Sequence, residues 1–255
     1  MSYDLYITGA GVSAKSGIPT FRGEDGYWTI GSSNYTPQEM ATRTMYLNQP
    51  DEFLLWYFKR FAKYRHVKPN SVHKWLSNKR LITQNIDGLD RKAGNKSFIP
   101  IHGSIDKVTL FENQDNLPSL EDAPWQGIQD SINTDADKEN LKKILLDAFK
   151  ISAKTLSPEL GSSLKPFVLL FDEYYTELYK ISKAEEMFKE ATSFIFIGTS
   201  FSVNITNIAL KTAVSRGCSI TIVDPKPVNL KIPGVKYLEM TAETFIKSSQ
   251  HDKYS

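Results

Sequence analysis

A short apolar run that ends in a glycine-rich turn constrains the fold of this chain more than any other feature. Leu5-Tyr-Ile-Thr8 is predicted to be a buried strand, and Gly9-Ala-Gly-Val-Ser-Ala14 follows it directly. These six residues satisfy the pattern G-x-G-x-x-A at the start of a predicted helix, which is the context of a dinucleotide fingerprint. In that fingerprint Gly9 allows a sharp turn, Gly11 lets backbone N–H groups approach a pyrophosphate, and Ala14 keeps helix and strand close. Alone the pattern is weak, because a structural turn can have the same sequence.

Further apolar runs along the chain repeat this signal. Each is short and ends in polar residues or glycine, as is typical of strands that are covered on both faces. The runs are residues 80–83, 166–171, 194–198 and 220–224. Apolar residues at helical spacing lie between them, for example over residues 183–192 and 203–215. Strands that alternate with helices predict an α/β fold with a Rossmann-like, doubly wound parallel sheet.

Two segments interrupt this alternation and predict a smaller, mainly helical module inserted into the large domain. In residues 34–75, Phe53, Tyr57 and Phe61 recur at helical spacing. Residues 106–163 begin with an acidic stretch, for which a loop and a solvated helix are both open, before a helical pattern over residues 140–150. We assign residues 1–33, 76–105 and 164–255 to a Rossmann-like dinucleotide-binding domain, and residues 34–75 and 106–163 to the module.

Charge and cysteine content exclude several classes of protein. Thirty-one basic residues against 29 acidic ones give a formal net charge of +2, so we expect no nucleic-acid partner. Cys218 is the only cysteine, which excludes an internal disulfide framework and a zinc site built from thiolates, and we expect no bound metal. The N-terminus lacks the regions of a signal peptide, and no apolar stretch is long enough to cross a bilayer. These features predict a cytoplasmic protein without a membrane partner.

The acidic residue that usually accompanies a dinucleotide fingerprint is not evident at the usual distance of about 20 positions. Asp224 could take this role from another strand, because it directly follows Ile220-Thr-Ile-Val223. A carboxylate at that position accepts hydrogen bonds from ribose hydroxyls and repels a 2′-phosphate. The sequence therefore favours NAD over NADP.

Ordered blocks of sequence extend the glycine turn into a larger pattern. The first is Gly9-Ala-Gly-Val-Ser-Ala-Lys-Ser-Gly-Ile-Pro-Thr-Phe-Arg22-Gly23, and later come Thr83-Gln-Asn-Ile-Asp87 with Ala93-Gly94, and Ile101-His102-Gly103. In order and spacing these blocks closely resemble the sirtuin (Sir2) family. Pro166-Phe-Val-Leu-Leu-Phe-Asp-Glu173 and Gly198-Thr-Ser200 agree with two further blocks of that family. The resemblance spans residues 7 to about 224 and implies an NAD-dependent protein-lysine deacylase.

The resemblance also implies a role for each site residue. The glycine turn and the Gly-Thr-Ser turn hold the phosphates and adenosine of NAD, and Phe21 and Arg22 close over the ribose and nicotinamide. Gln84, Asn85 and Asp87 line the nicotinamide pocket. His102 is the catalytic base, acting with Asn85 and Asp87. The expected cofactor contacts are Gly9, Ala10, Gly11, Ser13, Phe21, Arg22, Gln84, Asn85, Asp87, His102, Gly198, Thr199, Ser200 and Asp224.

These roles agree with elementary chemistry. Departure of nicotinamide develops positive charge on the ribose, which carboxamide and carboxylate groups in a dry pocket can stabilise. A neutral imidazole can then accept a ribose hydroxyl proton near its own pKa. His66, His73 and His251 lack such flanking blocks, so we expect them to be structural or solvated.

Departures from the family pattern lie in the module and on the acceptor side. The family usually carries four cysteine zinc ligands after the His-Gly block, and this chain has none of them, so residues 106–164 are expected to pack as a helical substitute. Asp172 stands where the family has glycine, beside the edge on which an acyl-lysine peptide pairs as an added strand. Its side chain could obstruct that peptide. Ile205 and Asp224 replace the usual proline and asparagine.

One further resemblance concerns the acyl group. Tyr57-Phe-Lys-Arg60 resembles the Tyr-x-x-Arg pair of class III sirtuins, whose arginine pairs with the carboxylate of malonyl- or succinyl-lysine. The commoner alternative is core packing of an amphipathic helix, with the arginine extending its charge toward solvent. The expected substrate-binding residues are Tyr57, Arg60, Phe171, Asp172 and Glu173.

Three functions are therefore open. The leading one is an NAD-dependent protein-lysine deacylase that forms O-acyl-ADP-ribose. Its expected partners are proteins that carry acetyl-lysine, or succinyl- or malonyl-lysine if the class III resemblance holds. The second is an NAD glycohydrolase or ADP-ribosyltransferase, motivated by Asp172 and the missing zinc ligands. The third is a non-catalytic NAD-sensing domain. All three require the glycine turn, residues 84–87 and His102 to converge on one cleft.

Overall fold

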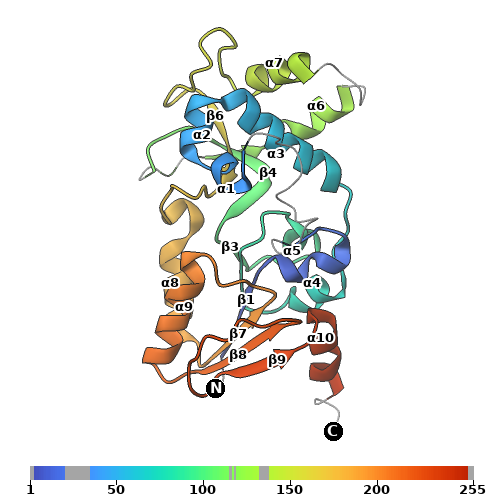
Figure 1. Ribbon diagram of the computed structural model, residues 1–255, viewed down its shortest axis with the longest axis vertical. Helices are drawn as coiled ribbons and strands as arrows, with labels where there is room; N and C mark the ends of the chain where they lie inside the picture. Colours follow the sequence, from blue (N-terminus) through green and yellow to red (C-terminus); the bar gives the residue numbers. More distant parts are fainter. Residues whose placement is uncertain (1–2, 21–34, 115–116, 118, 132–137, 252–255) are drawn as a thin grey trace. The chain divides into compact units, whose positions relative to one another are not determined.

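The apolar runs of the sequence form a parallel sheet. The computed structural model describes residues 3–20, 35–114, 117, 119–131 and 138–251. Over these residues six strands pair in the order β3-β2-β1-β7-β8-β9, and every pairing is parallel (Figure 1). The strands are β1 (Asp4–Thr8), β2 (Leu81–Thr83), β3 (Ile99–Pro100), β7 (Ser193–Ile197), β8 (Ser219–Asp224) and β9 (Lys236–Glu239). The predicted Rossmann-like, doubly wound fold is confirmed.

Helices cover both faces of this sheet because its strands are apolar on both sides. Tyr6, Leu81 and Ile195 lie in one buried cluster with Val72 of α4 (Ser71–Leu76) and Ile246 of α10 (Ala242–His251). On the other side, the alternating residue Phe194 contacts the ring of Phe188 in α8 (Ile181–Glu190), which packs against α9 (Asn204–Ser215) (Figure 1). The short helix α5 (Leu89–Lys92) follows β2.

The chain divides into two compact units, and their boundaries differ from those predicted. The first unit contains the described residues of 1–23, 67–101 and 180–255, and the second those of 24–66 and 102–179. Residues 67–75 belong to the first unit because α4 packs on the sheet. Residues 164–179 belong to the second because their strand pairs there and not in the parallel sheet.

The second unit contains a sheet as well as helices. In its described part, β4 (Gly103–Leu110) pairs antiparallel with both β5 (Leu120–Asp122) and β6 (Leu164–Val168). The expectation of a mainly helical module is therefore incomplete, and the run at residues 166–171 was wrongly assigned to the parallel sheet. Periodicity could not separate the two cases, because a continuous apolar run fits a buried strand in either kind of sheet.

Aromatic side chains form the core of the second unit. Helix α3 (Pro50–Tyr64) buries Phe53, Trp56 and Tyr57, and it packs against α6 (Trp125–Ser131) and α7 (Lys138–Ala148). The rings of Trp125 and Phe149 lie 4.5 Å apart between centroids. The helical stripe seen in the sequence is thus a packing surface. The other described helices of the second unit are α1 (Pro37–Met40), α2 (Arg43–Asn48) and the 3-10 helix η3 (Glu177–Tyr179).

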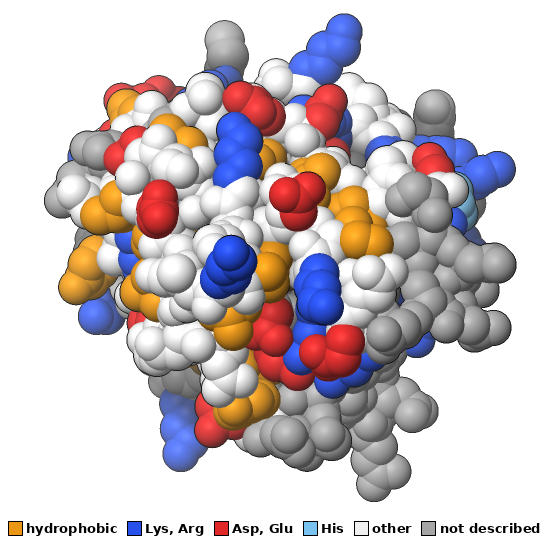
Figure 2. All heavy atoms as spheres, turned by 90° about the horizontal axis from the view of Figure 1, so that it is seen from above, with side chains coloured by type: hydrophobic (Ala, Val, Ile, Leu, Met, Phe, Trp, Pro, Cys, Tyr) orange, Lys and Arg blue, Asp and Glu red, His pale blue; other side chains and the backbone are white. Residues whose placement is uncertain are grey.

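The surface and the helix lengths bear on possible partners. On the face seen in Figure 2, acidic and basic side chains are interspersed with apolar ones, in keeping with the formal net charge of +2. Among the described residues, no helix combines the length and the apolar character that a membrane crossing requires.

Candidate functional site

The predicted cofactor residues of the first unit follow the carboxyl ends of its strands. Gly9 comes after β1, Gln84 after β2, Gly198 after β7, and Asp224 ends β8. Because β1 lies between β2 and β7, the strand order changes direction beside it. In open α/β sheets, ligands bind outside the carboxyl ends of the strands at such a switch point. The topology therefore places these residues on the edge where a dinucleotide is expected.

The glycine turn packs directly against the turn that follows β7. The Gly9 N–H donates to Ile197 O at 3.0 Å, and the Gly11 N–H donates to Gly198 O at 2.9 Å. A Cβ at Gly11 would lie 2.5 Å from Gly198 Cα, and Gly198 itself has a φ of +61°. Glycine at 11 is thus required by backbone contact, in addition to any ligand. Ala14 is exposed and has no role in holding a helix to a strand, since two short 3-10 helices, η1 (Ala10–Val12) and η2 (Ala14–Ser16), replace the predicted helix.

Ser13, Asn85 and Asp87 form a hydrogen-bonded cluster beside this turn. Ser13 Oγ donates to Asp87 Oδ2 at 2.6 Å, and Asn85 Nδ2 donates to Ser13 Oγ at 3.2 Å and to Gly9 O at 3.1 Å. The other carboxylate oxygen, Asp87 Oδ1, accepts the Leu89 N–H at 2.8 Å. The structure therefore brings together four predicted site residues and fixes both oxygens of the carboxylate.

His73 joins this cluster, which the sequence did not indicate. Its ring is fully buried, with Nε2 3.3 Å from Ser13 Oγ and Nδ1 accepting the Asn70 N–H at 3.3 Å. Because Ser13 donates its proton to Asp87, its oxygen is available to accept from a neutral His73. Burial lowers the pKa of His73, and the charge of Asp87 opposes this shift only in part. The one signal in the sequence that could have pointed to His73 is Asn70, a helix N-cap residue three positions before it.

The remaining predicted contacts of the first unit lie close to the same edge. Gln84 Nε2 donates to Thr199 Oγ1 at 3.1 Å, which links the ends of β2 and β7. Ser200 Oγ lies 2.6 Å from Ser202 Oγ. Asp224 Oδ1 accepts the Lys226 N–H at 2.8 Å and so closes a turn after β8. Phe21 and Arg22 lie outside the described residues.

Asp90, in α5 and three positions after Asp87, is a buried carboxyl that is 1% exposed. Burial, together with the neighbouring charge of Asp87, raises the pKa of Asp90 to about 7 from an ordinary 3.8. A raised pKa in the folded state favours the neutral acid. Its contribution to stability is therefore complete below pH 3.8 and is lost as the pH rises through 7.

The Asp90→Asn variant should remove this pH dependence. Between pH 5 and pH 8 the wild-type chain is expected to lose about 2–3 kcal/mol of unfolding free energy through this carboxyl, and the variant to lose none of it. Urea denaturation of both chains at the two pH values measures the difference. Parallel pH dependences for the two chains would contradict the burial argument.

His102 begins the second segment of the second unit, residues 102–179. The preceding residue, Ile101, donates its N–H to Thr83 O at 3.0 Å, and His102 O accepts the Leu169 N–H at 3.0 Å. Gly103 has a φ of +84°, and a Cβ there would overlap Phe167 O. The backbone of His102 is thus fixed against β6. Its Nε2 lies 2.9 Å from Tyr175 Oη.

Asp172 directs its carboxylate toward the start of α2. Its Oδ1 accepts the Arg43 N–H at 2.5 Å, and its Oδ2 accepts the Thr44 N–H at 3.0 Å. These two N–H groups begin α2 and have no partner within the helix. Burial alone would raise the pKa of Asp172, but the N–H donors bring it below its ordinary value. The carboxylate therefore caps a helix.

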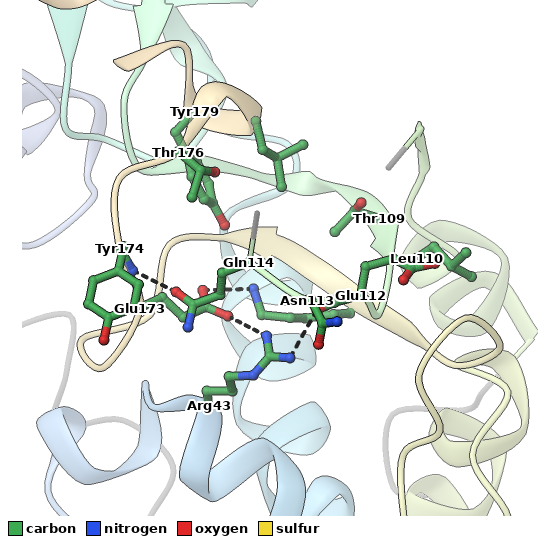
Figure 3. Close-up of a pocket in the computed structure, with 12 residues that line it drawn as sticks. Arg43, Thr109, Leu110, Glu112, Asn113, Gln114, Glu173, Tyr174, Thr176 and Tyr179 are labelled. Atoms are coloured by element: carbon green, nitrogen blue, oxygen red, sulfur yellow. Dashed lines mark hydrogen bonds and ion pairs between the residues drawn. The ribbon is translucent and has the colours of Figure 1, made fainter. Parts of the chain in front are cut away.

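Glu173 lies in the interior of the second unit, in a small cavity of about 30 Å³ (Figure 3). Its side chain is 4% exposed and forms ion pairs with Arg43 and Lys165, both at 3.1 Å. The neighbouring Phe171 is exposed, with its N–H bonded to Ala41 O. Of these three residues, Phe171 and Asp172 are exposed, whereas the Glu173 side chain is buried.

Tyr57 and Arg60 are also interior side chains, 0% and 1% exposed. The Arg60 guanidinium lies 3.2 Å from the centroid of a Trp56 ring and donates to Trp56 O at 2.9 Å. The burial of both side chains agrees with the core-packing alternative. The arginine differs from that alternative in one respect, because its charge does not extend to solvent. Within the described residues, no three histidine, cysteine or acidic side chains gather as a metal site.

Comparisons with known proteins agree on one family. A model of the Sir2 family matches residues 9–205. The chain is 32% identical over 248 residues to NAD-dependent protein deacylase 1 of Caldanaerobacter subterraneus subsp. tengcongensis, covering 94% of this chain and 90% of the relative. It is 30% identical over 252 residues to an NAD-dependent protein deacylase of Aquifex aeolicus, covering 94% and 91%.

Solved structures give the same result. The structure of a Sir2 homolog in complex with NAD superposes with a TM-score of 0.73 at 28% identity, covering 99% of this chain and 90% of that one. A mutant Sir2 homologue in complex with ADP-ribose superposes with a TM-score of 0.74 at 26% identity, covering 99% and 92%.

Proposed function

The chain belongs to the Sir2 family, and on this premise we propose that it is an NAD-dependent protein-lysine deacylase. The observation that carries the proposal is the cluster of Ser13, Asn85 and Asp87 beside the glycine turn, at the switch point of the sheet. A carboxylate and a carboxamide fixed in this way are the groups that cleavage of a nicotinamide–ribose bond needs.

NAD fits the chemistry of these residues, and when bound it supplies an electrophilic ribose carbon that bears nicotinamide as the leaving group. The Gly9-Ala-Gly11 and Gly198-Thr-Ser200 turns would hold its phosphates and adenosine, with hydroxyl and backbone donors on one sheet edge. Asp224, at the end of β8, would accept hydrogen bonds from ribose hydroxyls.

Three side chains of the protein have separate roles in the proposed reaction. Asn85 and Asp87 orient the nicotinamide and stabilise the positive charge that develops on the ribose, which they can do without reorganisation because their partners already hold them. His102 accepts a proton from a ribose hydroxyl. His102 follows Ile101 in the chain, and the Ile101 N–H donates to Thr83 O. Thr83 in turn directly precedes Gln84. The approach of His102 to the glycine turn is part of this proposal.

The acceptor in this proposal is an acyl-lysine protein, bound by addition of its strand beside the exposed Phe171. Incubation with NAD, with and without acetylated and succinylated peptides, tests it. Formation of O-acyl-ADP-ribose supports deacylation. Nicotinamide release that ignores added peptide would instead identify an NAD glycohydrolase or ADP-ribosyltransferase, and tight binding without release would identify an NAD sensor.

A cytoplasmic location, inferred from the single cysteine, belongs to the same proposal.

The same experiment separates the two interpretations of Tyr57 and Arg60. A preference for succinyl- over acetyl-lysine that disappears in the Arg60→Met variant would identify them as a carboxylate site. A preference for acetyl-lysine would identify them as packing residues, in line with their burial around Trp56.

A further inference from the structure

Tyr175 is a contact of the proposed base that no sequence block indicated. It lies between β6 and η3, and its Oη is 2.9 Å from His102 Nε2. The two rings are 5.9 Å apart between centroids and inclined by 27°, so they are close to parallel. Both residues belong to the second unit. The phenol therefore meets the imidazole at the nitrogen that could accept a proton.

The segment that carries Tyr175 is anchored on both sides. Before it, Glu173 is held by Arg43, and the Tyr174 N–H donates to Gln114 Oε1 at 2.7 Å (Figure 3). After it, Tyr179 is buried, with its ring stacked at 5.2 Å on Phe167 of β6. The position of Tyr175 is thus set by a network of contacts on either side of it.

The partner histidine is anchored to the same strand end. His102 O accepts the Leu169 N–H, and Gly103 pairs with Val168. The segments that carry His102 and Tyr175 both contact β6 or the residue that follows it. These contacts within the second unit therefore set the distance between Tyr175 Oη and His102 Nε2.

We propose that Tyr175 is a positioning residue for His102, an inference that rests on the proposed function. A neutral imidazole has one N–H and one lone pair. A hydroxyl that donates to Nε2 places the N–H on Nδ1 and holds the ring, so that Nε2 carries the lone pair. Because this lone pair accepts one donor at a time, a ribose hydroxyl takes the place of the phenol O–H at Nε2 and gives its proton there, while the phenol rotates its O–H away. Tyr175 stays neutral throughout.

The first test needs no NAD. The chain has four histidines, so ¹⁵N NMR of the imidazoles resolves them, and the signal lost in His102→Ala identifies His102. At a pH where the ring is neutral, the wild-type His102 should show the Nδ1–H tautomer, and Tyr175→Phe should shift it toward a mixture. Tyr174→Phe, whose side chain is 72% exposed, is the matched control and should leave the signal unchanged.

The second test is kinetic. Loss of one hydrogen bond to the base should lower kcat for deacylation about 3- to 10-fold in Tyr175→Phe, with the KM for NAD changed less than about two-fold. Tyr174→Phe should keep the wild-type kcat. A purely structural role would not change the tautomer of His102 in the folded chain.

The outcomes separate this inference from the proposed function. An unchanged tautomer in Tyr175→Phe overturns the positioning role, and so does a rise in kcat, which would mean that the phenol blocks the base. If the tautomer shifts but the wild-type chain releases no nicotinamide with any peptide, the proposed function fails while the pairing of Tyr175 with His102 is supported.

Discussion

The His102→Ala variant is expected to lower the rate of deacylation by about 10²–10⁴-fold, because it removes the only histidine placed by the sequence blocks as a general base. Binding of NAD should change little, since the Ser13–Asn85–Asp87 cluster makes its hydrogen bonds within the first unit. Steady-state rates of O-acyl-ADP-ribose formation, with NAD affinity measured by calorimetry, test both parts.

A second histidine provides the control for this substitution. His66 is exposed and is not part of the cluster, so His66→Ala should keep the wild-type rate within about two-fold. An unchanged rate in His102→Ala would remove this residue from the mechanism. A loss of NAD affinity equal to the loss of rate would mean that His102 acts in binding.

The parallel sheet could be predicted because its local signals agree with its long-range packing. The central strands β1, β7 and β8 are apolar on both faces and end at glycine or aspartate, so each is recognisable alone. The strand β9 was missed because it lies at an edge of the sheet, where Lys236 and Glu239 are exposed and the two residues between them are only half-buried. A short edge strand has little apolar pattern from which to be recognised.

The site could be predicted only where its residues belong to the ordered blocks of sequence that resemble the Sir2 family. Asn85 and Asp87 stand two positions apart, and their neighbour Ser13 belongs to the glycine turn. His73 and Tyr175 were not found, because they lie outside those blocks and reach Ser13 and His102 only through the folded chain. Tertiary packing decides such pairs, and a buried histidine or tyrosine alone fits many structural roles. The contact of Asp172 with the start of α2 was not predicted for the same reason.

A module without zinc ligands needs another source of order, and the ion cluster of Arg43, Glu173 and Lys165 is one in the described part of the second unit. Glu173 Oε2 accepts from Lys165 Nζ and from the Leu170 N–H, both at 3.1 Å, while its Oε1 pairs with Arg43. The cluster thereby joins β6 and α2 to the segment that precedes Tyr175 (Figure 3). Burial lowers the pKa of Lys165, and the charge of Glu173 opposes that shift.

The Glu173→Gln variant is therefore expected to lower the unfolding free energy by about 3–5 kcal/mol, because it leaves buried cations without their carboxylate. The double variant Glu173→Gln with Lys165→Met should recover part of this loss, since it removes one of those cations. Urea denaturation of the two single variants, the double variant and the wild type gives the coupling. Asp122→Asn is the control, because Asp122 is exposed in its pair with Lys107 and should cost less than about 1 kcal/mol. A loss in Glu173→Gln no larger than this control would mean that aromatic packing around Trp125 alone holds the second unit, since the buried charges would then contribute nothing beyond a surface pair.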